Sequence, residues 1–265
     1  MAEKRQNVFL DRRARRSAII TTLRYDYPHG HKVPWHFHEW DQLVYASQGV
    51  MTVRTETGSW VVPAQRAVWI PARMAHEIRM SGRVCMRTLY LKPRLGQRLQ
   101  RRCEVMNVSP LMKELILYGC ERPALIKKRR VHAHLIGMIL DQLNAAECVP
   151  LQLPEPFDPR SLRVAKPLLD DPSDQRSLEE LCELARASKR TIERLFQTET
   201  QMTFGKWRQQ LRLLHALRLL AEGAKITQVA LDAGYSTASA FISMFRKTLG
   251  TTPGQYFKKM QRADR

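Results

Sequence analysis

Residues 228–245 read QVALDAGYSTASAFISMF, and the same pattern occurs 49 residues earlier within residues 177–196, SLEELCELARASKRTIERLF. Six positions correspond at this offset: Leu181, Leu184, Ala185, Ile192, Leu195 and Phe196 align with Ala230, Ala233, Gly234, Phe241, Met244 and Phe245. The small residues Ala185 and Gly234 stand where a first helix can turn tightly into a second. Each stretch therefore predicts a helix, a tight turn and a helix.

The second helix of each unit is predicted to present a polar face outward, because its apolar residues recur at helical spacing and face inward. A hydroxyl oxygen at Ser188 or Thr237 is well placed to cap that helix. The expected DNA contacts are Ser188, Lys189, Arg190, Glu193 and Arg194 in the first unit, and Thr237, Ala238, Ser239, Ile242, Ser243 and Arg246 in the second. Because Arg can pair bidentately with guanine, the first unit carries the sharper base-reading chemistry.

A linking helix is predicted over Thr203–Glu222, with Trp207, Leu211, Leu214 and Leu217 facing inward. At 1.5 Å per residue this helix is ~30 Å long, which places the two outward faces about one turn of B-DNA, ~34 Å, apart. The alternative is a helical bundle whose arginines are only a solvated face. Such a bundle has no reason to repeat the turn, the cap and the apolar pairs at one offset.

The second unit closely resembles the signature of the AraC/XylS family of bacterial transcription regulators. The matching residues are Ala233-Gly234-Tyr235-Ser236-Thr237, Ser239, Phe241, Phe245-Arg246, Gly250, Thr252-Pro253 and Tyr256. The first unit is similar to the family's first motif, which implies that Arg190 and Arg194 lie on the DNA side. One departure is the segment 201–204, which reads Gln-Met-Thr-Phe. At this place the family usually has a turn that contains glycine and is followed by Ser-Pro.

The composition is that of a soluble globular protein: 265 residues, 44% hydrophobic and 26% charged. No apolar run reaches the roughly 18 residues of a membrane span and the N-terminus lacks a signal-peptide core, so we expect a cytoplasmic protein with no membrane partner. The five cysteines are scattered and form no C-x-x-C pair, which indicates neither a disulfide framework nor a cysteine zinc site.

The net charge of +19 favours a polyanionic partner, with double-stranded DNA the first candidate. The positive excess is 12 in residues 1–155 and 7 in residues 156–265, so charge alone does not locate the DNA-binding surface. Part of the N-terminal excess lies in Arg12, Arg13, Arg15 and Arg16. Whether these arginines contact nucleic acid or only water stays open.

Short β-rich runs separated by Gly, Pro and polar turns predict a sandwich or small barrel between Thr21 and Leu91. These runs are Gln42–Ser47, Val50–Thr55, Trp60–Val62, Ala67–Ile70 and Val84–Tyr90. Helical spacing then predicts helices at Leu111–Tyr118 and Lys127–Glu147, which resemble the dimerisation helices of the family. Three prolines in residues 149–156 predict an extended linker, and helix is expected after it up to a tail at Lys258–Arg265.

Together with these patterns, the resemblance to the AraC/XylS family implies a multi-domain α+β fold, with a cupin-like β-barrel and following helices before an all-α domain of two helix-turn-helix units joined by a helix. Its segments are a basic arm at 1–20, a cupin-like sensor domain at 21–95, a helical dimerisation region at 96–148, a Pro-rich linker at 149–160 and the tandem helix-turn-helix domain at 161–265.

The order His36-x-His38-x3-Gln42, followed by Pro71-x4-His76, resembles the metal-binding order of cupin barrels. That resemblance implies a divalent ion such as Zn²⁺, Fe²⁺ or Ni²⁺. Gln42 stands where cupins usually carry glutamate, although Asp41 could replace it if a bulge redirected its side chain. A metal-free pocket for a small effector and purely structural histidines are the two other interpretations.

Three aromatic side chains, Trp40, Tyr45 and Trp69, are candidates for lining a ligand pocket, with core packing the alternative. The sequence as a whole favours a dimeric, sequence-specific transcription regulator controlled by a small molecule or metal, with RNA polymerase as a further partner if it activates. One alternative is a cupin enzyme, an isomerase or oxygenase, with an accessory DNA-binding domain. Another is an architectural protein that binds DNA without sequence preference.

Overall fold

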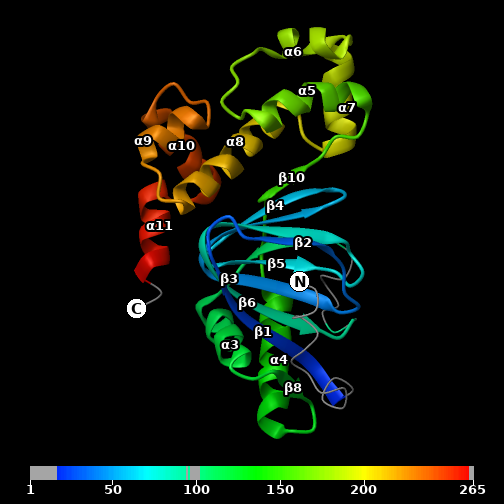
Figure 1. Cartoon of the computed structure of the whole chain (residues 1–265), viewed down its shortest axis with the longest axis vertical. Helices are drawn as coiled ribbons and strands as arrows, with labels where there is room; N and C mark the ends of the chain where they lie inside the picture. The colour runs from blue at the N-terminus through cyan, green and yellow to red at the C-terminus, as the bar shows by residue number, and fades with distance from the viewer. Residues whose placement is uncertain (1–16, 94, 96–101, 263–265) are drawn as a thin grey trace. The chain divides into compact units, whose positions relative to one another are not determined.

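The computed structural model describes residues 17–93, 95 and 102–262. The described residues form two compact units: one holds residues up to 56 together with 60–150, and the other holds 57–59 together with 151–262 (Figure 1). The division after Pro150 falls inside the segment expected to be a linker. Most of the expected basic arm, including Arg12, Arg13, Arg15 and Arg16, lies outside the described residues.

The N-terminal unit is built on antiparallel strands, and its central strands are β6, which pairs with β1, β2 and β3, and β3, which also pairs with β5. Its strands are β1 (Ala18–Tyr27), β2 (Lys32–His36), β3 (Asp41–Thr55), β4 (Gly58–Pro63), β5 (Arg66–Ile70), β6 (His76–Leu91), β7 (Glu104–Asn107), β8 (Ala124–Ile126) and β9 (Cys148–Val149). Their main order is β8-β1-β6-β3-β5-β7-β9, with β2 on β6 and β4 on β3. Strand β10 (Gln152–Pro154) lies in the C-terminal unit.

The two runs predicted at Gln42–Ser47 and Val50–Thr55 are one long strand, β3, with an irregular register between them. The bend depends on Gly49, whose φ of 79° lies in the left-handed region. A Cβ at this position would collide with the carbonyl oxygen of Arg83 on β6. Glycine is therefore required where the strand bends.

Two helices cover one face of the sheet (Figure 1): α3 (Pro110–Cys120) and α4 (Arg130–Ala145). Ser109 caps α3 by accepting a hydrogen bond from the amide of Met112 at 3.0 Å, and Pro110 fits its first turn. Buried side chains of these helices pack on sheet residues to form the core: Met112, Leu115, Ile116, Leu135, Ile136, Ile139 and Leu143 lie against Ile20, Leu43, Tyr45, Ala67, Trp69, Leu89 and Leu91.

The expected segment bounds of this unit differ from the structure. Strand β1 begins at Ala18, ahead of the expected start at residue 21, and β7, β8 and the first residue of β9 lie within residues 96–148, where only helices were expected. Strands of two to four residues are too short to produce a readable alternation of apolar and polar residues. Their pairing partners, which are distant in sequence, decide their conformation.

The C-terminal unit is helical. Its helices are α5 (Pro159–Asp170), α6 (Leu178–Ala185), α7 (Lys189–Thr200), α8 (Phe204–Ala221), α9 (Ile226–Asp232), α10 (Ala238–Leu249) and α11 (Pro253–Arg262). The expectation of a non-helical tail from Lys258 is wrong, because α11 continues to Arg262. Among the described residues, no helix combines the length and the apolar character needed to cross a membrane.

The linking helix α8 has the predicted inward face, since Trp207, Leu211, Leu214 and Leu217 are all buried. Trp207 also donates its indole N–H to the carbonyl of Pro154 at 2.8 Å. The predicted α+β architecture, a β-sheet domain followed by a helical domain with helix-turn-helix units, is confirmed.

Candidate DNA-binding surface and histidine cluster

The two helix-turn-helix units are α6–α7 and α9–α10. Their first helices begin 48 residues apart, at Leu178 and Ile226, whereas their second helices begin 49 residues apart, at Lys189 and Ala238. The distance from the start of the first helix to the start of the second is therefore one residue longer in the second unit than in the first.

This difference corrects the predicted turn residue of the first unit. Ala185 is the buried last residue of α6, and the left-handed conformation falls on Arg186, with a φ of 49°. In the second unit Gly234 takes this conformation, with a φ of 76°, as predicted. The sequence comparison used one offset of 49 residues throughout and so aligned Ala185 with Gly234. It did not allow for the one additional residue that the second unit has between the starts of its two helices.

The predicted caps of the second helices are confirmed. The Ser188 hydroxyl oxygen accepts a hydrogen bond from the amide of Thr191 at 3.2 Å, and the Thr237 hydroxyl oxygen accepts one from the amide of Ala240 at 3.1 Å. Both hydroxyl oxygens thus serve to start their helices.

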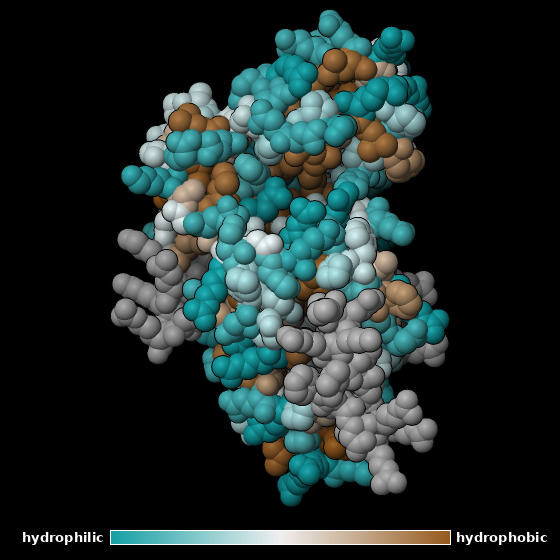
Figure 2. All heavy atoms as spheres, viewed as in Figure 1, coloured by the Kyte–Doolittle hydropathy of each residue, from teal (hydrophilic) through white to brown (hydrophobic). Residues whose placement is uncertain are grey.

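The predicted outward faces of α7 and α10 are accessible. Lys189, Arg190, Glu193, Arg194, Ser239, Ser243 and Arg246 are exposed, while Ala238 and Ile242 are half-buried. Figure 2 shows that the visible face of this unit is mostly hydrophilic, with hydrophobic residues in small separate patches. Both faces can therefore meet a polar surface such as the edge of a DNA groove.

An open hollow lies on α10 and is lined by Ser239, Ile242, Ser243, Arg246, Lys247 and Thr252. Lys247 and Thr252 were not among the predicted contact residues. Lys247 could have been predicted from the sequence, because it is a cation directly beside the predicted contact residue Arg246. Thr252 follows the end of α10, and only the tertiary structure brings it to the hollow.

Lys189 is paired with a carboxylate of the preceding helix, because its ammonium lies 2.7 Å from Glu179. This hydrogen-bonded pair raises the pKa of Lys189 and lowers the pKa of Glu179. Lys189 is thus partly neutralised in the free protein. It is less available to DNA than an unpaired lysine would be.

Arginines of α8 bind the loop that precedes the first unit. Arg208 donates hydrogen bonds to the carbonyl of Arg176, at 2.6 Å, and to that of Asp174. Arg212 donates to the carbonyls of Pro172 and Asp174 at 3.2 and 2.9 Å. Burial lowers the pKa of both guanidinium groups, and their bonds to carbonyl oxygens compensate for the lost solvation.

The same loop also touches the turn of the second unit. Gln175 donates its amide N–H to the carbonyl of Gly234 at 3.0 Å, and the Arg212 guanidinium lies 5.9 Å from the centre of the Tyr235 ring. The loop ahead of α6 and the turn ahead of α10 are therefore joined through one side of α8.

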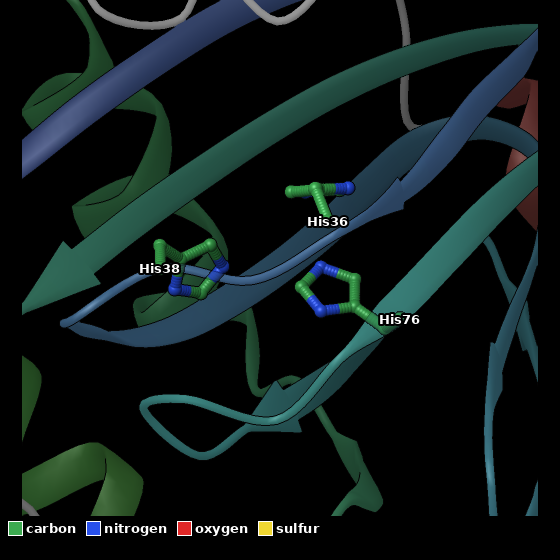
Figure 3. Close-up of side chains that lie close together, drawn as sticks. All are labelled: His36, His38 and His76. Atoms are coloured by element: carbon green, nitrogen blue, oxygen red, sulfur yellow. The ribbon is translucent and has the colours of Figure 1, made fainter.

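The structure brings His36, His38 and His76 together in the N-terminal unit, with their rings facing one another (Figure 3). One ligand atom from each lies within 4.8 Å of the other two. His36 ends β2 and is opposite His76, which begins β6. His38 does not share a strand with His36, since β2 ends at His36 and His38 follows in the connecting segment.

Backbone carbonyls orient all three imidazole rings through Nδ1: His36 lies 2.8 Å from the Pro34 oxygen, His38 lies 2.6 Å from that of Trp40, and His76 lies 2.9 Å from that of Met74. Because a carbonyl can only accept, each Nδ1 carries the proton, and in the neutral ring Nε2 is left with a lone pair. Within the part of the chain that the structure describes, the buried Nε2 atoms of His36 and His76 have no hydrogen-bond partner.

Burial lowers the pKa of His76 to about 3 and also lowers the pKa of His38. These rings are therefore neutral near pH 7. Neutral imidazole nitrogens are preferred ligands of Zn²⁺, Fe²⁺ and Ni²⁺. With two buried lone pairs left without a partner, the donor set fits such an ion.

Gln42 joins the cluster, because its side-chain oxygen lies 2.7 Å from His38 Nε2. Asp41 does not, since its carboxylate accepts a hydrogen bond from the amide of Ala72 at 2.9 Å. The regular pairing of residues 41–46 with β6 keeps Asp41 and Gln42 on alternate faces. The oxygen ligand offered here is an amide, and the bulge that would have presented Asp41 is not formed.

Two of the three candidate pocket aromatics are core residues. Tyr45 and Trp69 are buried in the cluster packed by α3 and α4, on the sheet face opposite Gln42. Both side chains thus take the core-packing role given as the alternative, and they do not face the histidines, because residues 42 and 45 of one regular strand point to opposite faces. Trp40 is half-buried, and its carbonyl holds His38.

Two family models match the chain. One is described as an AraC-like ligand binding domain and matches residues 20–204, and the other is described as a helix-turn-helix domain and matches residues 181–259. The transcriptional regulator NimR of Escherichia coli is 32% identical over 227 residues, which are 86% of this chain and 83% of NimR. RipA of Corynebacterium diphtheriae is 34% identical over 127 residues, which are 44% of this chain and 37% of RipA.

Solved structures of similar proteins include ToxT from Vibrio cholerae, with 11% identity and a TM-score of 0.39, over 91% of this chain and 99% of ToxT. The DNA-binding domain of AdpA, in complex with a target DNA, is 31% identical with a TM-score of 0.37, over 41% of this chain and 97% of that domain. The family matches and the similarity to NimR show that this chain belongs to the AraC family of transcription regulators, with a ligand-binding domain followed by a DNA-binding helix-turn-helix domain.

Proposed function

We propose that the protein is a dimeric, sequence-specific regulator of bacterial genes, acting in the cytoplasm, whose DNA binding is controlled by an effector held in the N-terminal unit. The supporting observation is the pair of capped helices α7 and α10, whose outward faces are accessible. On α7 the exposed guanidinium groups of Arg190 and Arg194 stand one helical turn apart. This chemistry suits base recognition in the major groove.

The decisive experiment is selection of bound sequences from random DNA, with and without candidate effectors. On the selected operator, Arg190→Ala should cost ~1–3 kcal/mol of binding free energy and relax one base position. The control Lys166→Ala removes a positive charge from α5 and should leave base preference unchanged. An equal loss of affinity on random DNA would favour an architectural protein without sequence preference.

We propose that dimers form through the helices of the N-terminal unit. The exposed apolar residues Leu111 and Tyr118 on α3, and Val131 and Met138 on α4, are each seven positions apart and so share one face of their helix. A second copy of the chain is the expected occupant of these faces. The double variant Val131→Asp/Met138→Asp should sediment as a monomer, whereas Arg83→Asp on β6 should not change the oligomeric state.

We propose that the effector is bound without turnover. Three carboxylates lie within three residues of a histidine of the cluster, and each has a partner: Glu39 pairs with Arg73 at 2.8 Å, Asp41 accepts from the amide of Ala72, and Glu77 pairs with the Lys32 ammonium at 2.6 Å. We therefore expect none of them to act as a general acid or base. Chemical conversion of a small molecule by the purified protein would instead support a cupin enzyme.

We propose that His36, His38 and His76 hold a divalent ion such as Zn²⁺, Fe²⁺ or Ni²⁺. A bound ion would supply a Lewis-acidic contact for an effector. Protein purified without chelators should contain about one equivalent of metal by elemental analysis. The variant His76→Ala should lose the metal, and His134→Ala, which removes an exposed histidine of α4, should keep it. Metal-free wild-type protein that still responds to its effector would contradict this proposal.

A further inference from the structure

The side-chain amide of Gln42 is held in one orientation by two hydroxyl groups of β6. Its nitrogen lies 3.1 Å from the Thr88 hydroxyl and 3.2 Å from the Tyr90 hydroxyl. Thr88 donates its own hydroxyl proton to the carbonyl of Leu43 at 3.0 Å, so its oxygen can only accept from Gln42. The amide nitrogen therefore faces Thr88, and the amide oxygen faces His38.

This orientation places two acceptors against each other. His38 Nδ1 donates to the carbonyl of Trp40, so in the neutral ring Nε2 presents a lone pair to the Gln42 oxygen at 2.7 Å. Such a contact requires a positive charge beside both atoms, either a proton or a metal ion. A proton on His38 would serve this contact alone and would leave the Nε2 atoms of His36 and His76 without a hydrogen-bond partner among the described residues. One divalent ion held by the three histidines and Gln42 would serve all four atoms.

We infer that Gln42 is an oriented, uncharged oxygen ligand that completes the three-histidine site, and that the site consequently recognises an anionic effector. This inference rests on the metal site proposed above. Three imidazoles and an amide leave the charge of a divalent ion uncompensated. Neither neighbouring carboxylate is among these four ligands, because that of Asp41 accepts from the amide of Ala72 and that of Glu77 is paired with the Lys32 ammonium.

The burial of the cluster indicates where such an anion enters. His76 and Gln42 are buried, whereas His36 and His38 are half-buried. The cluster is therefore accessible from the side of His36 and His38. In these partly desolvated surroundings an anion is attracted more strongly than it would be in water. The ligand class is a small molecule with an anionic oxygen or nitrogen donor, such as a carboxylate or a phenolate.

The test uses the full-length protein loaded with Co²⁺, whose visible spectrum reports its ligands, and sodium azide as the anionic probe. Azide should change the spectrum of the wild-type protein saturably. The variant Gln42→Glu should still bind Co²⁺ but should bind azide at least tenfold more weakly, because its carboxylate neutralises one charge. The control Gln48→Glu makes the same change at an exposed position of β3 and should bind azide like the wild type.

The outcomes separate this inference from the metal proposal. Failure of the wild-type protein to take up Co²⁺ would overturn both. Uptake of Co²⁺ with no response to azide, or equal azide affinity in Gln42→Glu, would overturn only the anionic effector.

A second variant tests the orientation of the amide without changing charge. Thr88→Val removes the hydroxyl that accepts from Gln42, so Co²⁺ should bind several-fold more weakly while the metal-loaded protein still responds to azide. Co²⁺ affinity equal to that of the wild type would show that Thr88 does not position Gln42.

Discussion

Arg212 on α8 lies against Gly234 so closely that a Cβ added to Gly234 would be 2.7 Å from the carbon at the centre of the Arg212 guanidinium. The same guanidinium donates to the carbonyls of Pro172 and Asp174, ahead of the first helix-turn-helix unit. One side chain therefore contacts the approach to the first unit and the turn of the second. The spacing of α7 and α10 depends on this contact as well as on the length of α8.

Gly234→Ala should destabilise the C-terminal unit by ~1–3 kcal/mol, because the left-handed φ of 76° is strained for alanine and the added Cβ must displace Arg212. Urea unfolding followed by circular dichroism measures the change. The control is Gly205→Ala in the first turn of α8, where, among the described residues, an added Cβ would meet no atom within 4 Å beyond its chain neighbours and the backbone of its own helix. This variant should be neutral or slightly stabilising. Equal stability of the two variants would contradict the close packing of Arg212 on Gly234.

Arg212→Met should weaken binding to a full operator by about tenfold, or ~1.4 kcal/mol, while binding to a half-operator changes little. The reason is that the variant frees the second unit to rotate relative to the first without altering either reading face. Fluorescence anisotropy with full and half operators checks this. Lys206→Met removes the same charge from an exposed site on α8 and should affect both DNAs equally. Equal losses for Arg212→Met would show that Arg212 does not set the spacing.

Glu179→Gln should increase the affinity for random DNA several-fold at low salt, because it frees the Lys189 ammonium and removes a negative charge beside α7. The slope of log affinity against log salt should become steeper by about one. Glu183→Gln removes a charge from the same helix, α6, without releasing Lys189. A gain of the same size in Glu183→Gln would mean that net charge alone is responsible.

The cysteines should differ in reactivity toward iodoacetamide at pH 8. Burial raises the pKa of Cys120 to about 12 and also raises that of Cys103, so both are protonated thiols at this pH. Because only the thiolate attacks, these two cysteines should react on unfolding, whereas the exposed Cys148 should react in the native protein. Mass spectrometry of the alkylated peptides checks the order. Rapid native modification of Cys120 would contradict its burial beneath β6.

The sequence by itself determined the features that depend on residues within a turn or two of one another. Ser188 and Thr237 cap their helices, and Trp207, Leu211, Leu214 and Leu217 form the buried face of α8, as predicted. These features follow from the helical period and from hydrogen bonds to an amide three residues away. The grouping of His36, His38 and His76 was also predictable from the sequence, because the order of these residues along the chain resembles the order of the metal ligands in cupin barrels.

Only the tertiary structure decided how distant segments meet. Strand register places Tyr45 and Trp69 beneath the helices and leaves Gln42 facing His38, and hydroxyls 46 and 48 residues away orient the Gln42 amide. The turn residue Arg186 and the contact of Arg212 with Gly234 likewise depend on an inserted residue and on packing across α8. Local periodicity contains no information about register between strands or contacts between helices, so these relations emerge only when the chain has folded.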